Sequence, residues 1–324
     1  NKKQRDCIPE TFKMSNIVAY ESESIFFPII SSPMDTITDS SMAVAMGRAG
    51  GLGIIHRYNT IQEQCEHVKR TYTNCLVAAA VGVTGDYLER AKALVEAGCD
   101  ILCVDVAHGH HALMRHALTT LRETVNDEVH IMAGNVATLE GFNDLADWGA
   151  NSIRVGIGGG SICSTRIQTG HGVPTLQSII DCSRSDRDVA LIADGGLKKP
   201  GDIVKALACG ADFVILGSML AGTSESPGQI VYNNGIQYKT YRGMASVEAQ
   251  IDWRGHTSSV EGVSHVVQLK GPVNDILNEL STGIRSGLSY SGALNLEDLR
   301  SKAKLIKQTS AGQVESHTHI KHRY

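Results

Sequence analysis

The chain has 324 residues, 42% of them hydrophobic and 33 of them glycine, a composition typical of globular α/β proteins. The formal net charge of −4 argues against a nucleic-acid partner. The sequence has no apolar run near 18 residues, and its first ten residues lack the apolar core of a signal peptide, so we expect no membrane partner. Eight cysteines without a Cys-x-x-Cys pair indicate a reducing compartment and predict a cytoplasmic protein.

Short apolar runs recur along the chain, and most of them are continuous rather than alternating. Continuous apolar runs are typical of strands that are buried on both faces of a parallel sheet. The eight predicted strands are Phe26–Ser31, Gly53–His56, Leu76–Val81, Ile101–Val106, His130–Gly134, Ser152–Gly156, Ala190–Asp194 and Phe213–Gly217.

Helical patterns separate these runs. The clearest is Asp86–Gly98, with apolar residues at positions 87, 88, 91, 94 and 95 and a glycine at its end. Gly141–Gly149 and Gly201–Gly210 also end in Gly-Ala before the next run. Eight strand–helix units predict a (β/α)₈ TIM barrel, with residues 1–324 forming a single catalytic domain. A doubly wound open sheet fits the same alternation and is the alternative.

The pattern changes after the eighth unit. Residues 226–275 are rich in Gly, Ser, Asn and Tyr and show little apolar periodicity. An insertion of this length inside a compact domain is usually functional or disordered. Because it follows the eighth strand of the predicted barrel, on the face where barrel active sites form, we expect the 226–275 segment to act as a lid.

Polar residues and glycines follow the predicted strands. Asp194-Gly-Gly196 and Gly217-Ser218 end the seventh and eighth runs, where barrels often build a phosphate site from backbone amides. The Asp194 carboxylate is better suited to accepting hydrogen bonds from a ribose diol. A phosphate together with a ribose predicts a nucleotide ligand.

Cys163 lies in a loop with six glycines, Gly156–Pro174, after the sixth predicted strand. Backbone N–H groups can stabilise a thiolate, and a thiolate can add to an electrophilic carbon to form a covalent intermediate. Thr165 is placed to orient a water or a leaving group. A lone cysteine is more often a packing residue, but the glycine-rich loop on the predicted active-site face favours a nucleophile.

Together, several segments resemble the inosine-monophosphate dehydrogenase / GMP reductase family over nearly the whole chain. The matching pieces are Ser32-Pro-Met-Asp-Thr36, Gly156-Ile-Gly-Gly-Gly-Ser-Ile-Cys-Ser-Thr-Arg166, Ala193-Asp-Gly-Gly196, Gly217-Ser-Met-Leu-Ala-Gly222, Tyr241-Arg-Gly-Met-Ala245 and Glu315-Ser-His-Thr-His319. This resemblance implies a barrel that acts on purine nucleotides, with Cys163 attacking C2 of the purine.

The resemblance also implies roles for further residues. Asp105, Val106 and Ala107 would face a nicotinamide cofactor, NADP(H) or NAD(H). The expected substrate-binding residues are Ser32, Met34, Asn135, Ser161, Asp194, Gly195, Gly196, Gly217, Ser218, Tyr241, Gly243 and Met244.

A potassium ion and a homotetramer follow from the resemblance as well. Carbonyl groups of Gly158, Gly160 and Cys163 would bind the ion. The segment Glu315, Ser316 and His317 of a neighbouring subunit would complete that site.

Two features favour the reductase within this family. His56 leads through a single predicted helix to Leu76, which leaves no room for the regulatory insertion that dehydrogenases usually carry. Arg254 in the predicted lid is followed by glycine rather than tyrosine, whereas Glu261 matches the lid glutamate that acts with the threonine after the cysteine in reductases. We therefore expect Cys163, Thr165 and Glu261 to be catalytic in a GMP reductase.

Other segments resemble the dehydrogenase, among them Gly50–His56 and Gly217–Pro227. An IMP dehydrogenase without a regulatory domain is therefore the alternative. A catalytically silent purine-nucleotide-binding barrel is the alternative of another class.

Overall fold

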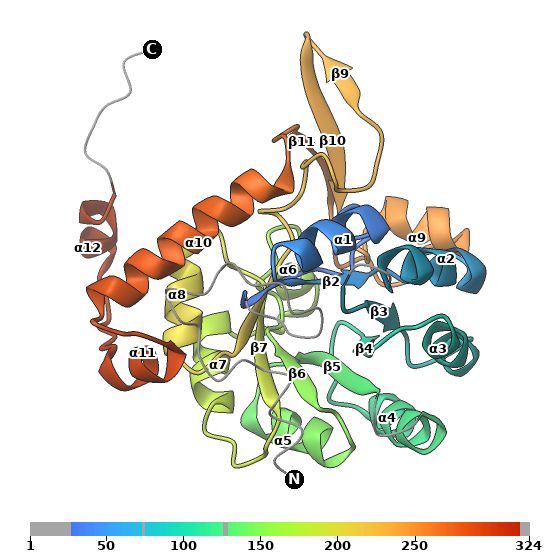
Figure 1. Ribbon diagram of the computed structural model, residues 1–324, viewed down its shortest axis with the longest axis horizontal. Coiled ribbons are helices and arrows are strands. Elements are labelled where there is room, and N and C mark those ends of the chain that lie inside the picture. Colours follow the sequence, from blue (N-terminus) through green and yellow to red (C-terminus); the bar gives the residue numbers. More distant parts are fainter. Residues whose placement is uncertain (1–26, 73–74, 126–128, 318–324) are drawn as a thin grey trace.

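A computed structural model describes residues 27–72, 75–125 and 129–317. Eight parallel strands pair in chain order, and β1 pairs with β8 to close the barrel (Figure 1). The predicted (β/α)₈ barrel is confirmed, and the open sheet is wrong, because no strand edge is left free in the barrel. The strands are β1 Ile29–Ser31, β2 Leu52–Ile55, β3 Ala78–Val81, β4 Ile101–Asp105, β5 His130–Val136, β6 Ser152–Val155, β7 Ala190–Asp194 and β8 Phe213–Leu216. Phe26, which begins the first predicted run, lies outside the described residues.

Side chains of each strand alternate between the inside of the barrel and the helices around it. In β3, Ala78 and Ala80 belong to the core inside the barrel, whereas Ala79 and Val81 belong to the core between strands and helices. Both faces of the strand are buried, as expected for a closed parallel barrel. This double burial explains why the strands are continuous apolar runs in the sequence.

The helices cover the barrel from outside. Helix α3 (Tyr87–Glu96) forms where predicted and ends before Gly98, whose φ of +101° favours glycine. Helix α5 starts before the predicted Gly141, because the side chain of Thr138 caps its N-terminus by accepting from the amide of Gly141. The helices that follow the strands are α1 Ser40–Arg48, α2 Ile61–Tyr72, α3, α4 Ala112–Thr124, α5 Leu139–Asp147, α7 Thr175–Cys182, α8 Pro200–Ala208 and α10 Val273–Tyr290.

The 226–275 segment forms strands and a helix, although its sequence shows little apolar periodicity. It contains β9 (Val231–Asn233), β10 (Ile236–Arg242), α9 (Val247–Arg254) and β11 (Ser264–Gln268), and the strands form an antiparallel sheet in the order β11-β10-β9. This sheet rises from the barrel at the top of Figure 1. Many of its side chains are exposed, so the alternation that reveals a half-buried strand is weak.

The last three residues of that segment already belong to α10, which packs against α8 and α1. Helix α10 therefore completes the ring of helices after β8. Two short helices follow, α11 (Leu296–Lys302) and α12 (Ser310–Glu315), and α12 lies at the left edge of Figure 1. Within the three described ranges, no helix combines the length and apolar character needed to span a bilayer.

His56 directly follows β2 and is 8% exposed, and its Nδ1 accepts a hydrogen bond from the amide of Tyr58. Burial lowers its pKa to about 4, so the folded protein holds a neutral imidazole. The unfolded chain takes up this proton near pH 6.5, well above the folded pKa. The contribution of His56 to stability is therefore present above pH 6.5 and is lost as the pH falls toward 4.

We predict that His56→Asn flattens the dependence of unfolding free energy on pH in this window. Asparagine can accept the bond from Tyr58 but does not titrate, so the slope should fall by about 1.4 kcal/mol per pH unit at most. Urea unfolding at pH 6.5, 5.5 and 4.5 measures the slope. An unchanged slope in a folded variant would contradict the assignment.

Candidate active site

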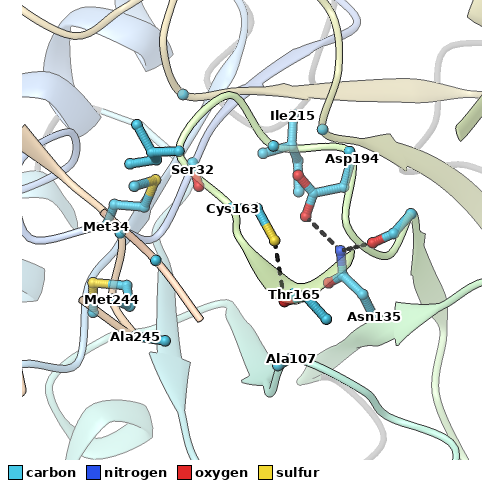
Figure 2. Close-up of a pocket in the computed structure, with 18 of the residues that line it drawn as sticks. Ser32, Met34, Ala107, Asn135, Cys163, Thr165, Asp194, Ile215, Met244 and Ala245 are labelled. Atoms are coloured by element: carbon cyan, nitrogen blue, oxygen red, sulfur yellow. Dashed lines mark hydrogen bonds between the residues drawn. The ribbon is translucent and has the colours of Figure 1, made fainter. Parts of the chain in front are cut away.

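A cavity of about 460 Å³ opens at the carboxyl ends of the barrel strands. Its volume lies in the range of small-molecule sites, roughly 300–1,000 Å³. In Figure 2, Cys163 lies between Met34 and Met244 on one side and Asn135 and Asp194 on the other. The cavity therefore lies on the face where barrel enzymes carry their active sites.

The loop that carries Cys163 follows β6 and begins with a backbone that only glycine permits. Gly156 has a φ of +146°, and a Cβ there would approach the carbonyl oxygen of Asp194 to 1.9 Å. The loop thus passes directly against the end of β7. This close approach brings the segment with Cys163 over the mouth of the barrel.

The same loop pairs with the 226–275 segment. The amide of Val263 donates to the carbonyl of Ile162 at 3.0 Å, and the amide of Ser164 donates to the carbonyl of Glu261 at 2.9 Å. Cys163 and Gly262 form an antiparallel bridge between these bonds. Backbone pairing therefore fixes Glu261 beside Cys163, although about 100 residues separate them in the chain.

A chain of side-chain hydrogen bonds starts at the sulfur. The Cys163 thiol donates to Thr165 Oγ1 at 3.1 Å, and the Thr165 hydroxyl donates to Glu261 Oε2 at 2.8 Å. The other oxygen of Glu261 accepts from the Ser259 hydroxyl at 2.9 Å. The nucleophile candidate, a hydroxyl and a carboxylate thus lie within one proton-transfer path.

Arg154 joins two predicted binding residues from inside the barrel. It projects from β6 and is 5% exposed. Its NH1 lies 2.5 Å from Asp105 Oδ1, and its NH2 lies 2.8 Å from Asp194 Oδ2. Burial by itself lowers the pKa of the guanidinium, but the two carboxylates raise it well above its ordinary value. Arg154 is therefore a permanent cation between the ends of β4 and β7.

Asn135 adds to this arrangement from β5. Its Nδ2 donates to Asp194 Oδ2 at 2.9 Å and to the carbonyl of Gly156 at 2.8 Å (Figure 2). Its Oδ1 is buried and has no hydrogen-bond partner among the described residues. The site therefore presents an amide oxygen that a donor group of a ligand can satisfy.

The opposite side of the cavity is built by β10. Tyr241 is 5% exposed, and its hydroxyl lies 3.2 Å from Ser161 Oγ. Burial raises the pKa of the Tyr241 phenol. A Cβ added to Gly217 would lie only 3.3 Å from this protonated hydroxyl. The loops after β6 and β8 therefore meet at Tyr241.

Helix α9 docks against the loop after β2. The ring of Trp253 stacks on Tyr58 with centroids 5.5 Å apart, and the Tyr58 hydroxyl donates to the carbonyl of Met244 at 2.9 Å. Arg242 bridges Asp35, at 2.6 Å, and Asp252 of α9, at 2.5 Å. The 226–275 segment is thus joined to the barrel on the side where Met244 lines the cavity.

Every residue that the sequence assigned to catalysis, substrate or cofactor lines this cavity, as do Gly158 and Gly160. The three residues of the C-terminal segment predicted for the metal site do not. Glu315 ends α12, and Ser316 and His317 follow it as exposed residues outside the lining. The structure therefore brings together the predicted site except for its C-terminal segment.

Three residues that line the cavity, Arg57, Tyr58 and Arg154, were not predicted from the sequence as site residues. The sequence does mark Arg154 as unusual, because it is the one charged residue in the apolar run 152–156. Arg57 and Tyr58 lie in the loop after β2, which places them on the active-site face.

Comparison with known proteins identifies the family. Residues 2–319 match the model of the IMP dehydrogenase / GMP reductase domain. The chain belongs to this family. Its members are oxidoreductases of purine nucleotides that use nicotinamide cofactors.

Relatives with both activities are similar to the chain. The inosine-5'-monophosphate dehydrogenase of Bacillus subtilis is 45% identical over 78% of this chain and 53% of its own length. The GMP reductase of Leishmania major is 44% identical over 75% of this chain and 52% of its own length. The chain thus spans about half the length of these relatives.

A solved structure is similar over almost the full chain. A cysteine-to-alanine variant of GMP reductase from Trypanosoma brucei, in complex with guanosine 5'-monophosphate, matches with a TM-score of 0.88 and 30% identity. The match covers 98% of this chain and 94% of the other.

We predict that Arg154→Met lowers the free energy of unfolding by about 3–5 kcal/mol, because Asp105 and Asp194 then lose their shared cation inside the barrel. Denaturant unfolding at neutral pH measures the loss. Arg187→Met is the matched control, since Arg187 also pairs with two aspartates but does so at the surface. An equal loss of unfolding free energy in both variants would show that the buried ion pairs of Arg154 stabilise the fold no more than the surface pairs of Arg187.

Proposed function

We propose that the protein is a GMP reductase, which converts GMP, NADPH and a proton to IMP, ammonia and NADP⁺. The observation that carries the proposal is the hydrogen-bonded path from Cys163 through Thr165 to Glu261. A cysteine adduct is common to both activities of the family. The carboxylate at the end of the path suits the departure of ammonia, which requires a proton at the leaving nitrogen.

In the proposed reaction, the Cys163 thiolate adds to C2 of the purine and makes a carbon–sulfur bond. Thr165 and Glu261 deliver a proton to the 2-amino group, and the carbon–nitrogen bond breaks to release ammonia. The nicotinamide cofactor supplies a hydride to C2 when bound. The carbon–sulfur bond then breaks, which returns the thiolate and leaves IMP.

The substrate would be held by the loops after β6, β7 and β8. The hydrogen bonds from Asn135 and Arg154 to Asp194 end on Oδ2, so Oδ1 would accept from the hydroxyl groups of the ribose. Backbone amides near Gly196 and Gly217, together with Ser161 and Tyr241, would bind the phosphate. Met34 and Met244 face Cys163 from the side opposite Asp194 (Figure 2), where they would pack on the base.

The cofactor would lie beside Asp105, Val106 and Ala107. The side chains present fit a phosphate-bearing cofactor, because Arg57 and Arg254 both line this cavity. Arg57 Nε is also buried without a hydrogen-bond partner among the described residues. These two cations would bind phosphate groups, while the contact with Arg154 orients the Asp105 side chain.

We also propose the potassium site and the homotetramer. Gly158 and Gly160 lie in the same loop as Cys163, and carbonyl oxygens are the ligands that a hard cation prefers. Helix α12 lies away from this loop in Figure 1. The Glu315–His317 segment would therefore have to come from a second copy of the chain.

IMP dehydrogenase is the second candidate, and one observation favours it. Arg254 lines the cavity close in sequence to Glu261, so a guanidinium is present that could activate water for hydrolysis of the adduct. In that case NAD⁺ would take the hydride from IMP, and water would yield XMP.

We predict that the purified protein consumes NADPH with GMP in the presence of potassium, and that Cys163→Ala abolishes this consumption while GMP still binds. Absorbance at the nicotinamide band measures the rate. Formation of NADH from IMP and NAD⁺, without NADPH consumption, would instead establish the dehydrogenase. Binding of GMP without either reaction would leave a silent nucleotide-binding barrel.

We predict further that Glu261→Gln lowers kcat about 100-fold or more, as expected for loss of a general acid–base group, with little change in the KM for GMP. Glutamine keeps the bond to Thr165 but cannot exchange the proton. Glu248→Gln is the control, because Glu248 lies on the exposed first turn of α9. A kcat near that of the wild type would remove Glu261 from the mechanism.

A further inference from the structure

The segment Gly217–Ser226 follows β8 and begins as one helical turn. The amides of Leu220 and Ala221 both donate to the carbonyl of Gly217, at 2.9 and 3.0 Å. The start of this turn lies in the cavity, because Gly217 and Ser218 line it. The carbonyls later in the segment need other donors.

Lys239 of β10 supplies three of these donors. Its side chain is almost fully buried, at 5% exposure. Its Nζ donates to the carbonyls of Thr223 at 3.0 Å, Ser224 at 3.1 Å and Ser226 at 2.6 Å. Asp39 and Glu225 attract this ammonium electrostatically, but its three hydrogen bonds all end on backbone carbonyls. A buried charge is costly unless polar groups replace its water, and here the three carbonyls do so.

Lys270 acts on the first part of the same segment. Its Nζ donates to the carbonyls of Ser218 at 2.8 Å and Met219 at 3.1 Å. Its own amide donates to the carbonyl of Gly222 at 2.8 Å. Lys270 follows β11, which pairs with β10 through Tyr238 and Gln268. Strand β10 and the segment after its neighbour β11 therefore each place an ammonium on the backbone that follows β8.

The face of β10 that carries Lys239 also carries Tyr241, two residues further along and likewise buried. Tyr241 contacts Ser161 of the loop after β6. Strand β10 thus fixes both loops that the proposed function assigns to the phosphate, one through a tyrosine hydroxyl and the other through a lysine.

We propose that Lys239, supported by Lys270, is a positioning residue for the 5'-phosphate subsite: it holds the Gly217–Ser226 segment so that the amides at its start face the phosphate of the nucleotide. This inference rests on the proposed purine nucleotide substrate. It does not depend on which of the two reactions follows, because GMP and IMP carry the same phosphate.

The test compares ligands with and without the phosphate. Lys239→Met should weaken GMP binding about tenfold or more, while the dissociation constant for guanosine stays the same, as measured by calorimetry. The conservative Lys239→Arg should recover part of the affinity for GMP. Lys205→Met on α8 is the matched control, since Lys205 is a half-exposed lysine paired with Asp202.

Unchanged GMP binding in a folded Lys239→Met, or equal losses for GMP and guanosine, would overturn the proposal. If Lys239→Met does not fold, Lys270→Met takes its place, with the same phosphate-specific loss expected. Hydrogen exchange of residues 217–226 should accelerate in either variant, and unchanged protection would also count against the proposal. Failure of the wild type to bind GMP would overturn the proposed function, and the exchange measurement would then decide on the role of Lys239.

Discussion

The site depends on one buried cation. Arg154 projects from β6 into the interior of the barrel and contacts Asp105 at the end of β4 and Asp194 at the end of β7. In a closed barrel these strands are not neighbours, so a side chain long enough to cross the interior is needed to join them. The carboxylates could not be held so close together without a cation between them, because like charges repel strongly where water is scarce.

The two carboxylates carry more charge than the one guanidinium between them, so this part of the site attracts hydrogen-bond donors of a ligand. One guanidinium faces two carboxylates, and Asn135 donates to the same oxygen of Asp194. The remaining acceptor oxygens at the cavity suit donor groups, such as the hydroxyls of a sugar. The wall formed by β10 and the Gly217–Ser226 segment instead contributes the Tyr241 hydroxyl, Gly217 and Ser218 to the cavity, while Lys239 and Lys270 bond the carbonyls of that segment. A nucleotide has matching polarity, with a sugar in the middle and a phosphate at one end.

A second constraint is the backbone pairing between the Cys163 loop and the 226–275 segment. It places Glu261 within hydrogen-bond distance of Thr165, and the docking of α9 through Trp253 and Tyr58 holds that segment on the barrel. Sequence motifs identified each partner separately. The strands of that segment were not predicted, because exposed strands such as β9 carry little apolar alternation.

The sequence by itself determined the barrel and most of its site. Continuous apolar runs followed by glycine and polar residues are enough to place Cys163, Asp194 and Gly217 on one face, since parallel strands all end on the same side. Only the tertiary structure decided that Arg154 pairs with two carboxylates and that Lys239 holds a loop by its carbonyls. Such contacts depend on the distance in space between side chains of strands that are far apart in the sequence. Neither apolar periodicity nor the spacing of motifs along the chain predicts that distance.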